Sequence, residues 1–290
     1  MNDSVVEEVL TFRCGGDLLP GIVSRPATPC GDLGVVIVVG GPQYRAGSHR
    51  QFVLWSRAIA TAGMPSMRFD VRGMGDAGGE QRSFTEIDDD IAAAIDVFTA
   101  RTNIRRVVLA GLCDGASAAL LYLDARPDPR VHGVALLNPW IRSAESQARM
   151  VVRHYYLRRL TDIGFWSKLL RGEVARSALS EAFAKLRAQF GRHAHANAAE
   201  GAADASYQRR MARALAALPG PALVVLSGED YTAREFADHA AGDSVWRQAL
   251  ALPQVRRFDL PGADHTFSAS IHRRQLEQAS IVWLTEVCLP

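Results

Sequence analysis

Long apolar runs, closely spaced cysteines and a strong net charge are all missing from this sequence of 290 residues. No apolar run approaches the roughly 20 residues that a membrane-spanning helix needs. The first residues, Met-Asn-Asp-Ser-Val-Val-Glu-Glu, lack the basic and apolar regions of a signal peptide. We therefore expect a cytoplasmic protein without a membrane span. The net charge of +2 gives no overall reason to expect nucleic acid as a partner.

The cysteines and histidines do not show the spacings that are typical of disulfide cross-links or of a metal site. Cys14, Cys30, Cys113 and Cys288 lie far apart without a Cys-x-x-Cys pair, which excludes a disulfide framework and the usual zinc-ligand spacing. The pair His193-x-His195 offers too few ligands for a metal site. We therefore expect no metal and no cofactor.

Strand and helix patterns alternate along most of the chain. The run from Gly34 to Gly41 is apolar and β-branched, which suits a strand buried on both faces of a parallel sheet. Alternation of this kind predicts an α/β fold with a mostly parallel, eight-stranded sheet flanked by helices. The expected strands are Val5–Phe12, Leu18–Ser24, Gly34–Gly41, Ser66–Val71, Arg106–Ala110, Val131–Leu137, Pro221–Ser227 and Val255–Leu260. The expected helices are Gln51–Ala62, capped by Ser48, Thr85–Arg101, capped by Thr85, Asp114–Ala125 and Ser268–Val287.

One helical block interrupts this alternation. Residues 141–218 carry apolar residues at helical spacing, together with 14 Arg and Lys against six Asp and Glu. We expect this block to be a helical cap, inserted into an α/β core formed by residues 1–140 and 219–290. Its net charge of +8 suits an anionic substrate, although a solvated helical surface is an equally good interpretation.

A Gly-x-Cys-x-Gly motif carries the strongest functional signal. Gly111-Leu-Cys-Asp-Gly115 lies between an apolar strand and a helix, where Gly-x-Ser-x-Gly forms the nucleophile elbow of many hydrolases. The helix that begins directly after Cys113 favours a thiolate at this position. The alternative is that Cys113 is a small buried core residue. We predict that Cys113 is the catalytic nucleophile.

The base and the acid are expected to follow later strands, in the chain order nucleophile, acid, histidine. Asp230 follows the strand that ends at Ser227, and His265 follows the strand that ends at Leu260. An imidazole can take the thiol proton and deliver it again, while a carboxylate fixes the tautomer of the imidazole. Glu229 is the rival acid, and Asp264 is interpreted as a turn residue.

The oxyanion hole is expected to use two backbone N–H groups. One belongs to Asp114, directly after the nucleophile, and the other to Gly41, with Gln43 as the alternative. Pro42 has no N–H and is excluded.

Several segments resemble the α/β-hydrolase superfamily, and within it the exosortase A system-associated hydrolases of the first type. The matching segments are Gly40–Phe52, Arg68–Gly79, Gly111–Ser117 and Gly228–Ala233. The resemblance implies an α/β-hydrolase fold with a catalytic triad and a link to bacterial exopolysaccharide and surface-protein sorting systems. It does not imply a substrate. We assign substrate-binding roles to Tyr44, Arg45 and His49, which follow the first parallel strand, and to Arg153 in the insertion.

Three functions remain open at this stage. The first is cleavage of an ester or thioester through an acyl-Cys intermediate on a small-molecule substrate. The second is transfer of the acyl group from an acyl carrier protein or a coenzyme A thioester to an amine or alcohol, because amines attack thioesters readily. The third is a non-catalytic binding member of the fold.

Overall fold

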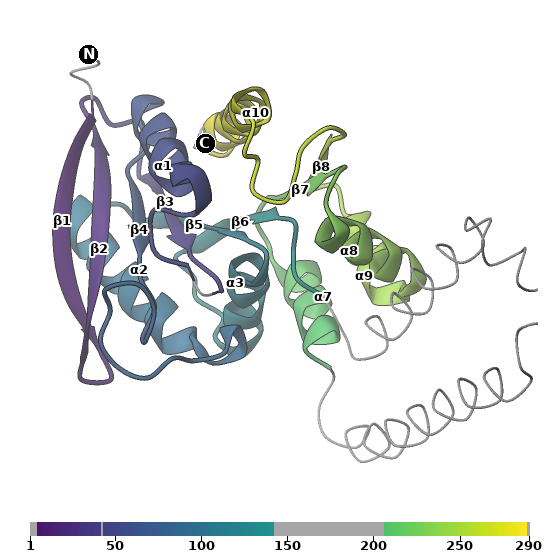
Figure 1. The fold of residues 1–290 in the computed structure, drawn as a ribbon, viewed down its shortest axis with the longest axis horizontal. Helices are drawn as coiled ribbons and strands as arrows, with labels where there is room; N and C mark the ends of the chain where they lie inside the picture. The colour runs from purple at the N-terminus through teal and green to yellow at the C-terminus, as the bar shows by residue number, and fades with distance from the viewer. Residues whose placement is uncertain (1–4, 42, 142–205, 289–290) are drawn as a thin grey trace, which may run out of the picture. The chain divides into compact units, whose positions relative to one another are not determined.

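The computed structural model describes residues 5–41, 43–141 and 206–288. Its sheet has eight strands in the order β1-β2-β4-β3-β5-β6-β7-β8 (Figure 1). Pairing is antiparallel within β1–β2 and β2–β4, and parallel from β4 to β8. The predicted mostly parallel, eight-stranded sheet is therefore confirmed. The strands are β1 (Val5–Cys14), β2 (Asp17–Pro26), β3 (Leu33–Val38), β4 (Ser66–Phe69), β5 (Arg106–Leu112), β6 (Val131–Leu137), β7 (Ala222–Ser227) and β8 (Val255–Leu260).

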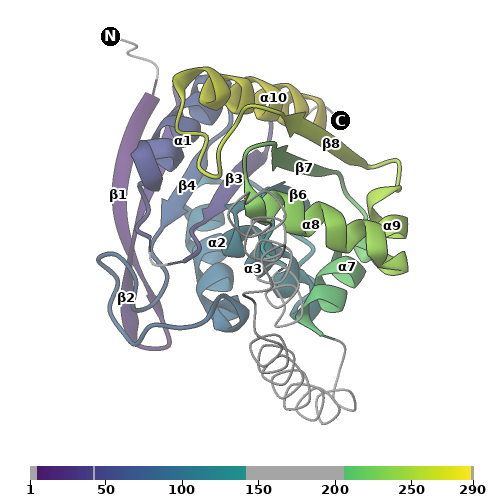
Figure 2. The same ribbon diagram turned by 45° about the vertical axis from the view of Figure 1, so that its right-hand side comes forward.

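Helices cover both faces of this sheet, which is why the central strand β3 has no polar side chain. Figure 2 shows α1 (Gln51–Thr61) and α10 (Ser270–Cys288) on one face, and α2 (Asp88–Thr102), α3 (Asp114–Ala125) and α7 (Tyr207–Ala217) on the other. Trp55 and Trp283 belong to the core on the first face, and Phe98 and Met211 to the core on the second. Every residue of β3 is buried between these two cores. None of the described helices is long and apolar enough to cross a membrane.

Helix α7 was expected to belong to the insertion but packs on the core. Its residues Met211 and Leu215 are fully buried, one helical turn apart, and contribute to the same core as α3. Contacts divide the chain into one unit of residues 1–141 and 207–290 and another of residues 142–206. We therefore place residues 207–218 with the core. The rest of the predicted cap, including Arg153, lies outside the described residues.

The helix starts differ from those expected. Ser48 begins a short 3-10 turn, η1 (Ser48–Arg50), and α1 has no side-chain cap because the residue before it is Arg50 in a left-handed conformation. Ser83, not Thr85, caps the turn η2 (Phe84–Glu86), in a capping box with Glu86.

Two further helices follow β7 and were not predicted, α8 (Tyr231–Gly242) and α9 (Ser244–Leu250). Asp230 and Asp243 cap them by accepting hydrogen bonds from backbone N–H groups of the first turn. The two Asp residues were thus a sequence signal for these helices.

Candidate active site

The strand register brings the predicted catalytic residues to one edge of the sheet. Val38 at the end of β3 pairs with Gly111 in β5, and Leu112 pairs with Leu137 at the end of β6. Ser227 at the end of β7 pairs with Leu260 at the end of β8. Loops that leave the carboxyl ends of neighbouring parallel strands meet at the same edge, where ligands bind in α/β folds. Cys113, Asp230 and His265 all lie in such loops.

Cys113 occupies a strained turn between β5 and α3. Its backbone angles, φ 60° and ψ −125°, belong to a region that residues other than glycine rarely adopt. A Cβ atom on Gly111 would lie 2.5 Å from the carbonyl carbon of Gly115, and one on Gly115 would lie 2.4 Å from the oxygen of Val38. Both glycines are therefore required for the close approach of α3 to β5 and β3. This geometry is that of a nucleophile elbow with Cys113 at its apex.

His265 and Asp230 form the second part of the site. His265 Nδ1 lies 2.8 Å from Asp230 Oδ2. An ionised carboxylate can only accept, so Nδ1 carries the hydrogen and Nε2 is left as the proton acceptor. Asp230 is held in place because it also caps α8, accepting from the N–H groups of Thr232 at 3.0 Å and Ala233 at 3.2 Å. Its buried carboxylate thus orients the imidazole.

The rival acids have other partners. The Glu229 side chain is 68% exposed and lies 3.6 Å from the Arg234 guanidinium. Asp264 accepts hydrogen bonds from the backbone N–H groups of Thr266 at 3.2 Å and Ser268 at 2.9 Å, as expected of a turn residue. Among the described contacts, the carboxylate that meets the His265 ring is that of Asp230.

Asn138 is a member of this site that the sequence analysis missed. It follows β6, is fully buried and has φ 43°. Its Nδ2 donates to Ser227 Oγ at 2.9 Å and to the His265 backbone oxygen at 3.1 Å, and its Oδ1 accepts from Ser227 N at 2.8 Å. Asn138 therefore ties the end of β7 to the histidine loop. The signal was a single polar residue directly after an apolar strand.

The predicted oxyanion-hole residues lie where β3 ends and α3 begins. Gly41 has φ 66°, and a Cβ atom there would lie 3.4 Å from Asp114 Oδ2. The N–H of Gln43 already donates to the Gly41 oxygen at 2.7 Å in a tight turn. The N–H groups of Gly41 and Asp114 also have an acceptor, the Asp114 carboxyl, so the choice between Gly41 and Gln43 stays a prediction.

The side chain of Asp114 is an unexpected feature of this corner. Burial raises the pKa of the Asp114 carboxyl, although backbone N–H groups of Asp114, Gly115 and Gly41 oppose the shift. A buried carboxyl group therefore lies beside both of the N–H groups, those of Gly41 and Asp114, that we expect to bind an oxyanion.

The predicted substrate-binding residues have mixed surroundings. Tyr44 is exposed, with the Arg45 guanidinium 5.0 Å from its ring centre. Arg45 forms ion pairs with the buried Asp70 and, at 2.7 Å, with Asp76. These pairs hold the loop after β3 in place, so they give Arg45 a structural function. Its role in substrate binding, like that of Tyr44 and His49, stays a prediction.

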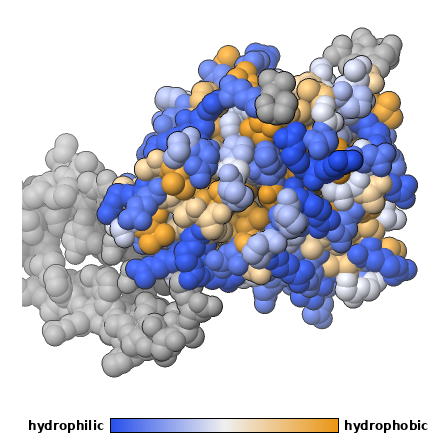
Figure 3. All heavy atoms as spheres, turned by 180° about the vertical axis from the view of Figure 1, so that it is seen from behind, coloured by the Kyte–Doolittle hydropathy of each residue, from blue (hydrophilic) through white to orange (hydrophobic). Residues whose placement is uncertain are grey.

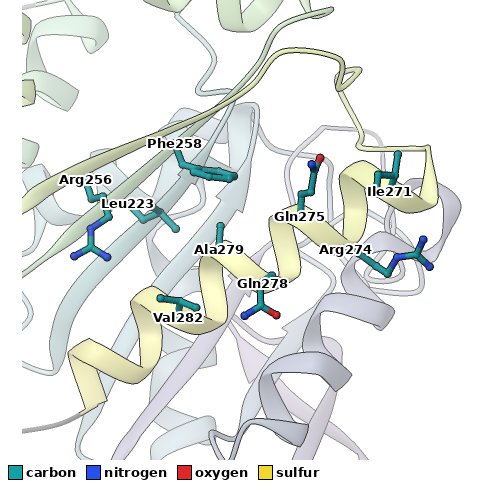
Figure 4. A pocket seen from close by; sticks show the side chains of 9 residues that line it. All are labelled: Leu223, Arg256, Phe258, Ile271, Arg274, Gln275, Gln278, Ala279 and Val282. Atoms are coloured by element: carbon teal, nitrogen blue, oxygen red, sulfur yellow. The ribbon is translucent and has the colours of Figure 1, made fainter.

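A described cavity lies elsewhere in the fold. It has a volume of about 530 Å³ and is lined by residues of β7, β8 and α10, among them Leu223, Phe258, Ile271 and Val282 (Figure 4). Its charged lining residues are Arg256 and Arg274, so it offers neither a nucleophile nor a base. The back of the molecule mixes hydrophobic and hydrophilic side chains (Figure 3). The candidate site is therefore identified by its thiol, imidazole and carboxylate and not by this cavity.

Within the described ranges, no three His, Cys, Asp or Glu side chains are grouped so that they could hold a metal ion. The carboxyl edge of the sheet carries a thiol, an imidazole and a carboxylate, with backbone N–H groups nearby.

Comparisons with known proteins agree with the observed fold. A model of the family Hydrolase_4, described as serine aminopeptidase, S33, matches residues 33–252. An esterase of Pyrococcus furiosus is similar in structure, with a TM-score of 0.63 and 13% identity over 98% of this chain and 94% of that chain. Est1E of Butyrivibrio proteoclasticus, solved with ferulic acid bound, also has a TM-score of 0.63 and 13% identity, over 97% of this chain and 100% of that chain. A putative hydrolase of Agrobacterium vitis has a TM-score of 0.57 and 16% identity, over 96% and 98%. No curated protein matches the sequence.

Proposed function

Because this chain belongs to the Hydrolase_4 family (serine aminopeptidase, S33) and has the α/β-hydrolase fold, we propose that it is an esterase that works through an acyl-Cys113 intermediate. The observation that carries the proposal is the His265–Asp230 pair, 2.8 Å apart at the sheet edge where Cys113 forms the elbow. A strained nucleophile turn and an oriented imidazole are the two parts that acyl transfer requires.

In the first step, His265 Nε2 takes the proton of the Cys113 thiol, and the sulfur attacks the carbonyl carbon of an ester or thioester. The charge that develops on the carbonyl oxygen is stabilised by the N–H groups of Asp114 and Gly41. The imidazolium then returns its proton to the leaving alcohol or thiol, and the acyl group remains on Cys113. Throughout, the Asp230 carboxylate stabilises the imidazolium through Nδ1.

In the second step, His265 takes a proton from water, which attacks the acyl-Cys113 thioester. The carbon–sulfur bond breaks, the thiolate regains its proton from the imidazolium, and the acid is released. The family is described by a serine nucleophile, and this chain carries cysteine at the elbow. The intermediate is thus a thioester in place of an oxygen ester.

This exchange supports a second candidate function. Amines attack thioesters readily, so the acyl group on Cys113 can pass to an amine or alcohol instead of water. Anionic donors such as coenzyme A or an acyl carrier protein would match the excess of basic residues in residues 142–206, where 11 Arg and Lys stand against six Asp and Glu. The resemblance to exosortase A system-associated hydrolases is compatible with either function.

The substrate class is proposed from the neighbours and the chemistry. The similar chain from Pyrococcus is an esterase, and Est1E binds ferulic acid, an aromatic carboxylic acid. We therefore propose carboxylic esters and thioesters as donors, with aryl esters as the first probes.

Intact-mass labelling tests the proposal. The protein is mixed with p-nitrophenyl acetate, and the acyl adduct and nitrophenol release are followed together. We expect one acyl group on Cys113 and a burst of nitrophenol, both abolished in Cys113→Ala. Cys14→Ala is the matched control, because Cys14 is a buried cysteine of β1, and it should label like the wild type.

Undiminished labelling of Cys113→Ala would show that Cys113 is not the nucleophile. Adding a primary amine to the same reaction, with the reaction without protein as the control, distinguishes the two functions. Hydrolysis predicts that the acid stays the product, whereas transfer predicts that the amide replaces the acid beyond the amount formed without protein.

A further inference from the structure

Two thiols that lie 258 residues apart in the sequence meet near the beginnings of β3 and β5, whereas the elbow follows the end of β5. Cys30 lies between β2 and β3, and Cys288 is the last residue of α10. Their sulfur atoms are 3.6 Å apart, and Cys288 Sγ also lies 2.9 Å from the Cys30 backbone oxygen. Cys288 is buried, whereas Cys30 is partly exposed. The pair is therefore in contact, and one of its members is open to solvent.

Two glycines make room for this pair. A Cβ atom on Gly31 would lie 3.0 Å from Cys288 Sγ, and one on Gly63 would lie 2.9 Å from Cys30 Cβ. Both glycines have positive φ, and Cys30 N donates to the Gly63 oxygen at 2.7 Å. The Cys30 backbone is thus fixed from one side, with its sulfur directed at Cys288.

The end of α10 is fixed from the other side. Arg106 Nη2 donates to the Cys288 oxygen at 3.1 Å, and Arg106 Nε donates to Asp32 Oδ1 at 2.7 Å. Asp32 lies two residues after Cys30, so the same ion pair holds the helix end and the Cys30 segment together. An arginine at a helix C-terminus also satisfies carbonyl groups that have no partner within the helix.

We propose that Cys30 and Cys288 are a site of reversible oxidation, where a low-molecular-weight disulfide converts the two thiols into a disulfide that ties α10 to the β2–β3 segment. A disulfide bond is about 2.05 Å long, so the sulfur atoms must approach by roughly 1.5 Å from their present contact. Rotation about the side-chain bonds of Cys30, which is partly exposed, supplies this movement.

The reaction runs in two exchange steps. The Cys30 thiolate attacks one sulfur of glutathione disulfide, which breaks that bond and releases one glutathione thiolate. Cys288 then loses its proton to solvent and attacks the Cys30 sulfur, which releases the second glutathione. Two protein thiols are oxidised and one glutathione disulfide is reduced to two glutathione thiols. Burial and the neighbouring Cys30 raise the pKa of Cys288 to about 11, so Cys30 is the thiol that reacts first.

Bridging these residues closes a loop that contains nearly the whole chain. In the chain-entropy account, a cross-link stabilises a protein by restricting the unfolded state, and more so for longer loops. Cys113 lies at the other end of β5, so the disulfide leaves the elbow open. We therefore expect oxidation to raise thermal stability and to leave ester turnover unchanged.

The test is titration of the full chain with glutathione disulfide, followed by intact mass and peptide mapping. In the wild type we expect a loss of two hydrogens, a Cys30–Cys288 linked peptide and reversal by dithiothreitol. The midpoint of thermal unfolding should rise by about 5 °C. Cys30→Ser and Cys288→Ser should each abolish the linked peptide and the rise. Cys14→Ala should retain the linked peptide and the rise in the unfolding midpoint. Cys113→Ala removes the elbow thiol, so any glutathione bound to Cys113 in the wild type is absent there, while the cross-link remains.

Glutathione retained on Cys30 in the wild type, with no linked peptide, would overturn the proposal. So would a linked peptide without an increase in the unfolding midpoint, because the disulfide would then not stabilise the fold. The Cys30 and Cys288 variants are expected to keep wild-type ester turnover, which makes this result independent of the esterase assignment.

Discussion

Asn138 donates a hydrogen bond from its side-chain amide to the backbone oxygen of His265 at 3.1 Å, although 127 residues separate them in the chain. The same amide group bonds to the backbone and hydroxyl of Ser227. Asn138 thus fixes the loop that presents the imidazole, while Asp230 fixes the ring itself. The position of His265, which follows β8, therefore depends on contacts with residues at the ends of β6 and β7.

Replacing Asn138 with Ala should lower activity by misplacing His265. The change leaves buried polar groups of Ser227 and His265 without partners, which costs about 2–3 kcal/mol of unfolding free energy. We expect kcat for an aryl ester to fall about tenfold or more, with KM within about twofold. Asn103→Ala is the matched control, since Asn103 also has a left-handed backbone but ends α2. It should lose stability and keep kcat. An unchanged kcat in Asn138→Ala would mean that the loop carrying His265 keeps its position without the Asn138 hydrogen bonds.

Replacing Asp230 with Asn separates the two functions of this residue. Asparagine still caps α8, so the unfolding midpoint should stay close to that of the wild type. The amide does not stabilise an imidazolium as a carboxylate does, so kcat should fall by about two to four orders of magnitude, and further still in His265→Ala. Glu229→Gln, a change in the exposed neighbour, should keep wild-type rates. A greater loss in Glu229→Gln would reassign the acid.

The buried carboxyl of Asp114 predicts a pH-dependent effect on stability. Because burial raises its pKa, the folded protein binds this proton more tightly than the unfolded chain does. Ionisation of Asp114 therefore lowers the free energy of unfolding as the pH rises above the ordinary carboxyl pKa of about 4. Below this pH the carboxyl is protonated in both states, and the loss is absent. We expect Asp114→Asn to have a higher free energy of unfolding than the wild type at pH 7, and this gain should be smaller at pH 3. Urea unfolding of both proteins at both pH values measures it. Asp89→Asn, in the exposed first turn of α2, should show no such gain. The same difference at both pH values would contradict the prediction.

Replacing Arg45 with Met tests whether this residue stabilises the loop after β3 or binds the substrate. The change leaves the buried Asp70 carboxylate without its cation, although backbone N–H groups of Arg45 and Asp76 still donate to it. We expect a loss of about 2–3 kcal/mol in unfolding free energy, with kcat/KM within about threefold. Arg126→Met breaks the exposed pair with Asp89 and should cost only a few tenths of a kcal/mol. A large rise in KM for Arg45→Met would restore the substrate-binding role.

Local patterns were sufficient to predict the sheet and the elbow. Strand patterns and turn signals predicted all eight strands to within a few residues, and β6, β8 and α3 have the predicted bounds, because strand and helix periodicity is a property of neighbouring residues. Gly111 and Gly115 around Cys113 mark a turn that tolerates no Cβ atom, so this motif also acts locally. Helices α8 and α9 were missed because Asp230 and Asp243, which begin them, were not interpreted as N-caps.

Relationships between distant segments were decided by the tertiary structure. The sequence left Glu229 and Asp230 as rivals, and only the packing of the β7 and β8 loops shows which carboxylate meets His265. It described four cysteines far apart, and only the docking of α10 brings Cys30 and Cys288 into contact. It offered Asn138 only as a polar residue after an apolar strand, and only the fold shows that Asn138 bonds to His265. The physical reason is that hydrophobic periodicity fixes where a strand or helix begins and ends, whereas the register between strands and the packing of helices fix which of their ends meet.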